Sequence, residues 1–313
     1  MARRLRFIPE GGALVEVTCR TMQGRFLLKP SDELKSIIIG VLARAQRLYP
    51  VELHAFVFLS NHYHLLLSVD DAPQLARFMN FLNSNLAREA GRLHGWREKF
   101  WGRRYQAIVI SQEEAAQIDR LRYLLSHGCK EGLVARPRDW PGAHCVEALL
   151  EGLPLRGLWF DRTQEYAARA RREEFDRFAY ASPETIRLEP LPCWQHLPSE
   201  TLRSRVAELV LQIETETADR HAKKATRPMG VSAVLAQNPH DKPLKPKKAL
   251  APAFHAASKA ARRELVEAYR WFVGAYREAA EKLRQGDFRV GFPAGSFPPR
   301  LPVVVRIPDL APG

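Results

Sequence analysis

Two histidines separated by a single residue, His62 and His64, have the types and spacing that could do chemistry. They lie in a run from Leu59 to Leu67 that is rich in residues favouring β-strands. Because side chains alternate between the faces of a strand, His62 and His64 point the same way and Tyr63 points the other way. Two imidazoles on one face can hold a divalent cation from the same side. The other interpretation is a solvent-facing pair with no function.

The flanking residues favour a site. Apolar runs at 54–59 and 65–69 enclose Ser60-Asn61, which predicts a hairpin whose second strand begins with the histidines. The run from Ser60 to Leu66 resembles the His-hydrophobic-His signature of the single-tyrosine HUH transposases, and more narrowly of their REP-associated tyrosine transposase branch. The resemblance covers roughly residues 3–150, about half of the chain. It implies an enzyme that cuts and rejoins single-stranded DNA with a divalent metal ion, Mg²⁺ or Mn²⁺, held by His62 and His64.

The resemblance also implies a tyrosine nucleophile on a later helix, and Tyr123 matches it. His127 follows four residues on, one turn along the same helix face. The REP-associated branch has Tyr-x-x-x-Asn-Pro here, whereas this chain has His127 in place of the Asn and no proline. A histidine can complete a metal site. The alternatives stay open: Tyr123 as a half-buried structural tyrosine, and His127 as a residue at the helix C-terminus that interacts with the dipole.

Tyr105 is the competing nucleophile, but we expect it on a strand, where its phenol is less free to approach a metal. Trp101, Arg103 and Arg104 around it are predicted to stack on bases and contact phosphates of a DNA strand. Ordinary strand residues would give the same pattern.

A later segment also resembles the REP-associated branch, with Gly-Leu-Val followed by Pro-x-x-Trp from Gly132 to Trp140. Arg136, Arg138 and Trp140 are predicted to contact bases and phosphates there. A Trp-Pro turn that packs back on the domain is the alternative.

The elements that must position these residues follow the order strand, helix, strand, strand, helix, strand, helix. The predicted ranges are 14–22, 31–47, 54–59, 62–69, 71–95, 100–110 and 111–128. This order predicts an α+β fold of the ferredoxin-like, split βαβ type, an antiparallel sheet with helices on one face. The HUH transposases have the same fold.

Charge and cysteine usage limit the class of protein. The formal net charge of +13 in 313 residues predicts an anionic partner, most commonly nucleic acid. Four scattered cysteines without a C-x-x-C pair predict a reducing cytoplasm and no zinc ribbon. No apolar run reaches the roughly 18 residues of a membrane helix, so we expect no membrane partner.

We expect three regions. Residues 1–150 form the HUH domain, residues 151–290 a mostly helical, basic accessory segment, and residues 291–313 a proline-rich tail. Two amphipathic helices, 199–222 and 257–283, are predicted to pack together around a flexible basic loop at about 223–253. This segment suits a DNA-binding module or a scaffold. A homodimer is also open, because some relatives exchange the tyrosine helix between subunits.

The resulting hypothesis is a metal-dependent DNA transposase, or endonuclease and strand transferase, that acts at hairpin-associated single strands through a phosphotyrosine intermediate. The alternatives are a catalytically silent DNA- or RNA-binding protein on the same scaffold, which the missing Asn-Pro favours, and a metal-dependent hydrolase without a covalent step.

Overall fold

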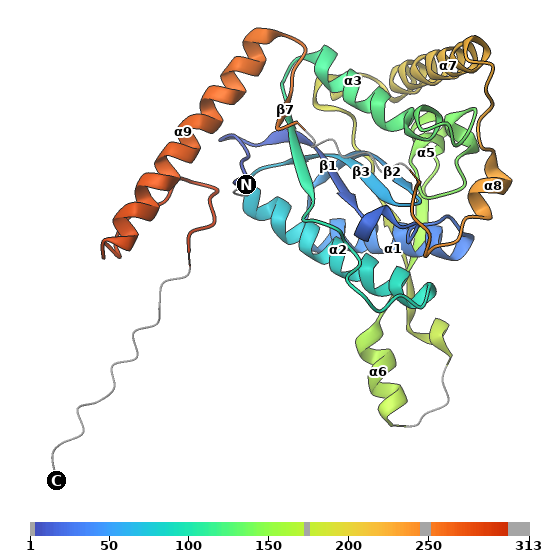
Figure 1. Ribbon diagram of the computed structural model, residues 1–313, viewed down its shortest axis with the longest axis horizontal. Helices are drawn as coiled ribbons and strands as arrows, with labels where there is room; N and C mark the ends of the chain where they lie inside the picture. Colours follow the sequence, from blue (N-terminus) through green and yellow to red (C-terminus); the bar gives the residue numbers. More distant parts are fainter. Residues whose placement is uncertain (1–3, 172–175, 245–251, 300–313) are drawn as a thin grey trace.

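The computed structural model describes residues 4–171, 176–244 and 252–299 (Figure 1). Its centre is a five-stranded sheet in the order β2-β3-β1-β4-β7. The strands are β1 (Ala13–Arg20), β2 (Glu52–Leu59), β3 (His62–Val69), β4 (Gln106–Ile110) and β7 (Phe254–His255). The first four pair antiparallel in the order of the split βαβ fold, as predicted, and β7 adds a short parallel strand at the edge beside β4.

Two helices cover one face of the sheet, as predicted, whereas a third covers the other face and corrects the expectation of helices on one face only (Figure 1). The first two are α1 (Asp32–Leu48), which begins at an N-cap hydrogen bond from the Ser31 side chain, and α2 (Ala72–Leu93), capped in the same way by Asp71. Their apolar stripes pack on the sheet and on each other. On the opposite side, α3 (Glu114–Leu125) is followed directly by α4 (His127–Lys130).

The β2–β3 hairpin has the predicted register. Leu59 pairs with His62 across the Ser60-Asn61 turn. Strict alternation then sends Tyr63 toward α2, where its hydroxyl donates to Asn83 Oδ1 at 2.6 Å. The same alternation directs His62 and His64 toward α3 and α4. One face of β3 therefore packs against α2, and the other face directs the two histidines toward α3 and α4.

The second half of the chain contains helices and a small two-stranded sheet. Its elements are α5 (Val146–Glu151), β5 (Leu155–Phe160), α6 (Arg162–Ala170), β6 (Ala181–Ile186), α7 (Ser199–Lys223), α8 (Val231–Leu235) and α9 (Lys259–Arg284). Strands β5 and β6 pair antiparallel and pack on α1. A Cβ atom on Gly40 would lie 2.2 Å from the backbone of Leu158, so this contact requires a glycine in α1.

Three predictions about elements need correction. The fourth strand begins at Gln106, because the chain bulges between the Thr18–Gln106 and Thr21–Trp101 pairs. The two long C-terminal helices do not pack together: α7 lies on α3, α4 and α5, whereas α9 lies beside β7 at the edge of the sheet (Figure 1).

The third correction concerns the segment predicted to be a flexible loop. Residues 224–244 contain α8 and are hydrogen-bonded to the first half of the chain: Met229 N–H donates to Gly132 O at 2.8 Å, and Phe26 N–H donates to Asp241 O at 3.0 Å. Val234 is fully buried. Residues 245–251 of the predicted loop lie outside the described residues.

Candidate metal and tyrosine site

Neighbouring polar side chains hydrogen-bond the two histidines of β3 on the side away from the cluster. The Asn61 side chain in the hairpin turn places Oδ1 2.6 Å from His62 Nδ1. Glu16 on the neighbouring strand β1 places Oε1 2.6 Å from His64 Nδ1. Because a carboxylate accepts, His64 carries its proton on Nδ1, and the lone pair on Nε2 is left for a ligand.

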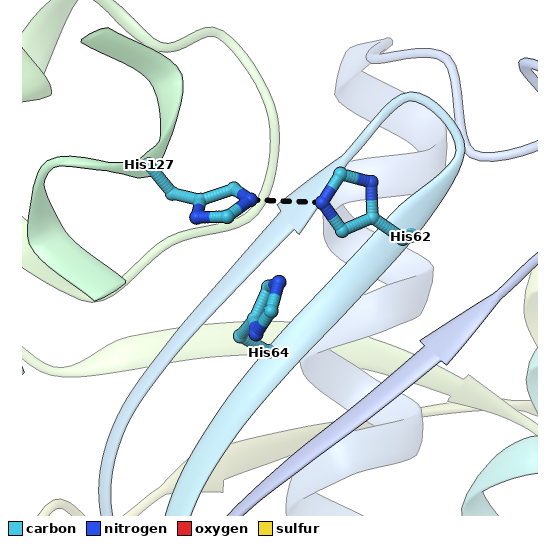
Figure 2. A group of neighbouring side chains, drawn as sticks. All are labelled: His62, His64 and His127. Atoms are coloured by element: carbon cyan, nitrogen blue, oxygen red, sulfur yellow. Dashed lines mark hydrogen bonds between the residues drawn. The ribbon is translucent and has the colours of Figure 1, made fainter. Parts of the chain in front are cut away.

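His127 joins this pair from the other side. The predicted single helix 111–128 is wrong here: the hydrogen bonds of α3 end at Ser126, and His127 opens α4. Its imidazole lies against the histidines of β3 rather than one turn along the helix of Tyr123. The three side chains are 8%, 6% and 2% exposed for His62, His64 and His127. One nitrogen from each lies within 4.8 Å of the others, and the His62 and His127 Nε2 atoms are 2.8 Å apart (Figure 2).

This donor set fits a divalent cation. The His62 and His127 Nε2 atoms share a hydrogen bond at 2.8 Å, so one of them carries a proton that a bound cation would displace. Asn61 and Glu16 supply the outer hydrogen bonds that metal-bound histidines usually have. Three protein ligands leave further positions for water or substrate, which is the pattern of a catalytic rather than a closed structural site.

Tyr123 lies beside this cluster. Its ring centroid is 5.6 Å from that of His64 and 5.0 Å from that of His127. Two cations face the ring, with Arg120 Cζ at 4.5 Å and Lys130 Nζ at 4.2 Å from its centroid. Burial and the charge of Glu16 raise the pKa of the phenol, while Arg120 opposes them. The tyrosine is thus half-buried, next to the candidate metal ligands and under positive charge.

Glu16 is the residue that the sequence analysis missed. It is 1% exposed, and besides His64 it binds Arg120, whose Nη1 lies 2.7 Å from Oε2. Burial alone would raise its pKa, but the hydrogen bonds and charges of His64 and Arg120 outweigh it and lower the pKa. One carboxylate therefore joins a candidate ligand to the arginine that packs on Tyr123. An acidic residue inside the apolar alternation of 14–19 was the available signal.

The competing tyrosine has no such surroundings. Tyr105 is 8% exposed, and burial raises the pKa of its phenol. The guanidinium of Arg6 lies 5.5 Å from its ring centroid. The structure places none of the three histidine rings in contact with it among the described residues.

The residues predicted to bind DNA have different environments. Trp101 donates its indole N–H to Asn83 O at 2.8 Å and packs edge-on against Tyr63. Arg103 and Arg104 are exposed at the same end of the sheet as His62, and Arg104 donates to Arg4 O at 3.0 Å. Their role in binding DNA stays a prediction.

Trp140 corrects the prediction for the later segment. It is 3% exposed, and its indole N–H donates to Phe58 O at 2.9 Å, so no base can stack on the ring. The turn packs back on the domain instead. Arg136 and Arg138 are exposed, and Arg138 forms an ion pair with Glu151 at 2.7 Å.

Comparison with known proteins gives one family. Residues 20–124 match the family model described as "Transposase IS200 like", a range that contains His62, His64 and Tyr123 but ends before His127. No curated protein sequence matches the chain.

Two solved structures are similar to parts of the chain. One is a REP-associated tyrosine transposase bound to a REP hairpin, with 18% identity over 49% of this chain and 88% of that one, and a TM-score of 0.41. The other is a protein assigned as a transposase from Deinococcus radiodurans R1, with 20% identity over 39% of this chain and 95% of that one, and a TM-score of 0.27. In the described part of this chain, no helix is long and apolar enough to cross a membrane.

Proposed function

We propose that this protein cuts and rejoins single-stranded DNA through Tyr123 at a divalent cation held by His62, His64 and His127, because residues 20–124 match the family model described as "Transposase IS200 like" and the three histidines converge. The observation that carries the proposal is the convergence of three imidazoles with a tyrosine that lies 5.6 Å from one of them, ring centre to ring centre. Few structural needs call for three buried imidazoles facing one another, since each must find a polar partner.

The chemistry is a phosphoryl transfer to the phenol oxygen. Tyr123 gives its proton to water, its oxygen attacks the phosphorus of a phosphodiester, and the bond to the 3′ oxygen breaks. That oxygen takes up a proton from water and leaves as a 3′-OH. The product is a 5′ phosphotyrosine link, the polarity that the family resemblance implies. A 3′-OH from another end reverses the step and joins two strands. When bound, the cation supplies Lewis-acid polarisation of the scissile phosphate.

The protein's own charges support each stage. Arg120 and Lys130 face the Tyr123 ring, where their positive charge attracts the phosphate, and Arg120 partly offsets the burial that raises the pKa of the phenol. Glu16 fixes the tautomer of His64 and holds Arg120 in place. A net charge of +13 gives sequence-independent attraction for the DNA backbone.

The ligand set favours one class of ion over another. Imidazole nitrogens suit divalent transition metals, whereas Mg²⁺ binds oxygen ligands and keeps several waters. We therefore propose Mn²⁺ or a similar transition metal ahead of Mg²⁺. All four candidate residues lie together within this one chain, which supports a site built from a single subunit. The proposed substrate is hairpin-forming single-stranded DNA, as the sequence resemblance implies.

The test is a covalent adduct on labelled hairpin DNA with Mn²⁺, resolved on a denaturing gel. We expect an adduct with the wild type and with Tyr105→Phe, and none with Tyr123→Phe or with the double variant His62→Ala/His64→Ala. Metal-dependent cutting that survives Tyr123→Phe without an adduct would support a hydrolase. DNA binding without cutting by the wild type would support the silent binding protein, and either result would overturn the proposal.

A further inference from the structure

A cavity lies between the N-terminal segment and α9, away from the histidines. Its volume is about 240 Å³. Arginines and aromatic rings dominate its lining, which consists of Arg4, Leu5, Arg6, Arg104, Phe272, Tyr276, Ser296 and Phe297. No acidic side chain is present among these lining residues. The cavity is smaller than the roughly 300–1,000 Å³ of sites for drug-sized ligands, so it suits one nucleotide unit and not a duplex.

Aromatic packing builds this cavity before any ligand arrives. The ring of Phe7 contacts those of Phe254 in β7 and of Tyr269 and Phe272 in α9, at centroid distances of 6.4, 5.5 and 5.3 Å. These contacts hold the N-terminal segment along α9. Beyond α9 the chain folds back, and the Tyr276 hydroxyl donates to Phe297 O at 3.1 Å. Residues 4–6, Arg104 and the stretch 272–297, which lie far apart in the sequence, thus meet around one space.

Arg6 is the central cation of this cavity. Its guanidinium lies 4.7 Å from the ring centroid of Phe297 and 5.5 Å from that of Tyr105. Its Nε is buried and finds no hydrogen-bond partner among the described residues. A buried donor without a partner is costly, and an anionic ligand would satisfy it. The adjacent ring of Phe297 is 41% exposed, so it offers a face for stacking.

We propose that this arginine–aromatic cavity binds one nucleotide of the DNA strand that flanks the cut site. Guanidinium groups would bind its phosphate and Phe297 would stack on its base, the combination by which proteins bind single strands without reading sequence. This inference rests on the proposed function, because it assigns the cavity to the same DNA molecule.

The path from the histidines to the cavity follows the end of the sheet. Arg20, the last residue of β1, pairs with His62 on one side, and its carbonyl accepts from Gly102 N–H at 2.9 Å on the other. Arg104 follows two residues later and lines the cavity. Neighbouring strands are about 4.8 Å apart, so a single strand that leaves the histidines needs only a few nucleotides to reach Arg104.

The test compares hairpin DNA with and without an eight-nucleotide single-stranded flank, by fluorescence anisotropy with the full chain. We expect the flank to tighten binding of the wild type at least tenfold. Arg6→Glu and Phe297→Ala should remove most of that gain while hairpin-only affinity changes less than twofold. The matched control is Arg156→Glu, which makes the same charge change at an exposed position of β5. Thermal melting of each variant checks folding, and Phe297→Ala, at a partly exposed position, covers the case in which Arg6→Glu fails to fold.

Three results would overturn the inference. The first is a loss of affinity with Arg6→Glu that is the same for hairpin DNA with and without the flank. The second is a loss of affinity with Arg6→Glu that is no larger than with Arg156→Glu. The third is tenfold tighter binding of an RNA flank than of the DNA flank. Adduct formation is measured separately. If the wild type forms no adduct on Tyr123 but the flank still tightens binding, the proposed function is refuted. If the adduct forms but the flank does not tighten binding, only this inference is refuted.

Discussion

The two faces of β3 show how three consecutive residues divide between structure and chemistry. On the α2 side, Tyr63 is fully buried, hydrogen-bonded to Asn83, and burial raises the pKa of its phenol well above the ordinary value. On the α3 side, His62 and His64 meet His127, Glu16 and Tyr123. The lesson is that a buried tyrosine without a nearby cation is a packing residue, whereas a half-buried one under two cations and beside three imidazoles is suited to act as a nucleophile.

The largest expected effect is the difference in DNA adduct formation between variants of Tyr123 and Tyr63. Tyr123→Phe should abolish the DNA adduct, a loss of at least 1,000-fold, because no oxygen remains to attack. Tyr63→Phe should keep adduct formation within threefold and lower the free energy of unfolding by about 1–2 kcal/mol, since it removes a buried hydrogen bond to Asn83. Gel assays and denaturant melts measure both. If Tyr123→Phe and Tyr63→Phe both lose the adduct while equally stable, the two faces of β3 do not differ in function as proposed.

The next largest effect concerns Glu16, the carboxylate that holds His64 on the α3 side of β3. Glu16→Gln should weaken binding of Mn²⁺ by about 10–100-fold, because the outer partner of His64 loses its charge. Isothermal titration calorimetry measures the affinity directly, without reference to activity. The control is Glu52→Gln, which removes an exposed carboxylate from the neighbouring strand β2. An affinity that changes equally in the two variants would show that Glu16 acts only through net charge.

A third prediction concerns a histidine that serves packing. Burial, and then the charge of Lys35, lower the pKa of His144 to about 4. The folded state therefore takes up this proton less readily than the unfolded state, so stability is lost as the pH falls from about 6.5 toward 4. At pH 5 the loss is of order 2 kcal/mol.

The variant His144→Asn should reduce the fall in stability between pH 7 and pH 5, because asparagine does not titrate and its side-chain oxygen can accept from Val146 N–H, as Nδ1 does now. Part of the fall should remain, since burial also lowers the pKa of His54. Denaturant melts at the two pH values measure the difference. An unchanged pH dependence in the variant would contradict the assignment.

The smallest effect tests how α7 is attached to α3. Arg122 and Glu216 form an ion pair whose side chains are 31% and 64% exposed. Exposed pairs contribute little, so Glu216→Gln should lower the free energy of unfolding by less than about 0.5 kcal/mol. The buried side chains of Val206, Val210 and Ile213 account for the attachment instead. A loss above about 1.5 kcal/mol in a denaturant melt would contradict this view.

Much of the first half could be predicted from sequence because its signals are local. The alternation through His62 and His64 and the caps at Ser31 and Asp71 each fix a feature within a few residues. The spacing of Tyr123 and His127 predicted their proximity but not its cause, because His127 lies in α4 and not on the helix of Tyr123. The strand order of the split βαβ sheet followed from the order of the elements. The role of each site residue is a proposal that the experiments above test.

The features that sequence did not predict depend on long-range contacts. Glu16 reaches His64 only because β1 and β3 are neighbours, and Arg120 only because α3 crosses above them. Strand β7 has two residues, too few for a periodic pattern, and β5 and β6 are separated by α6, which hides their hairpin. The burial of Trp140 is set by a backbone carbonyl 82 residues earlier in the chain.

The most direct test of the central claim is to locate the DNA on the protein. The wild type is allowed to form its adduct with Mn²⁺, the DNA is digested to a short remnant, and the tryptic peptides are analysed by mass spectrometry. Cleavage after Arg122 and Lys130 isolates Tyr123 in the peptide 123–130, apart from Tyr105 and Tyr63. We predict a nucleotide phosphate on Tyr123 in that peptide. A modified Tyr105 or Tyr63, or no modified peptide, would contradict the account.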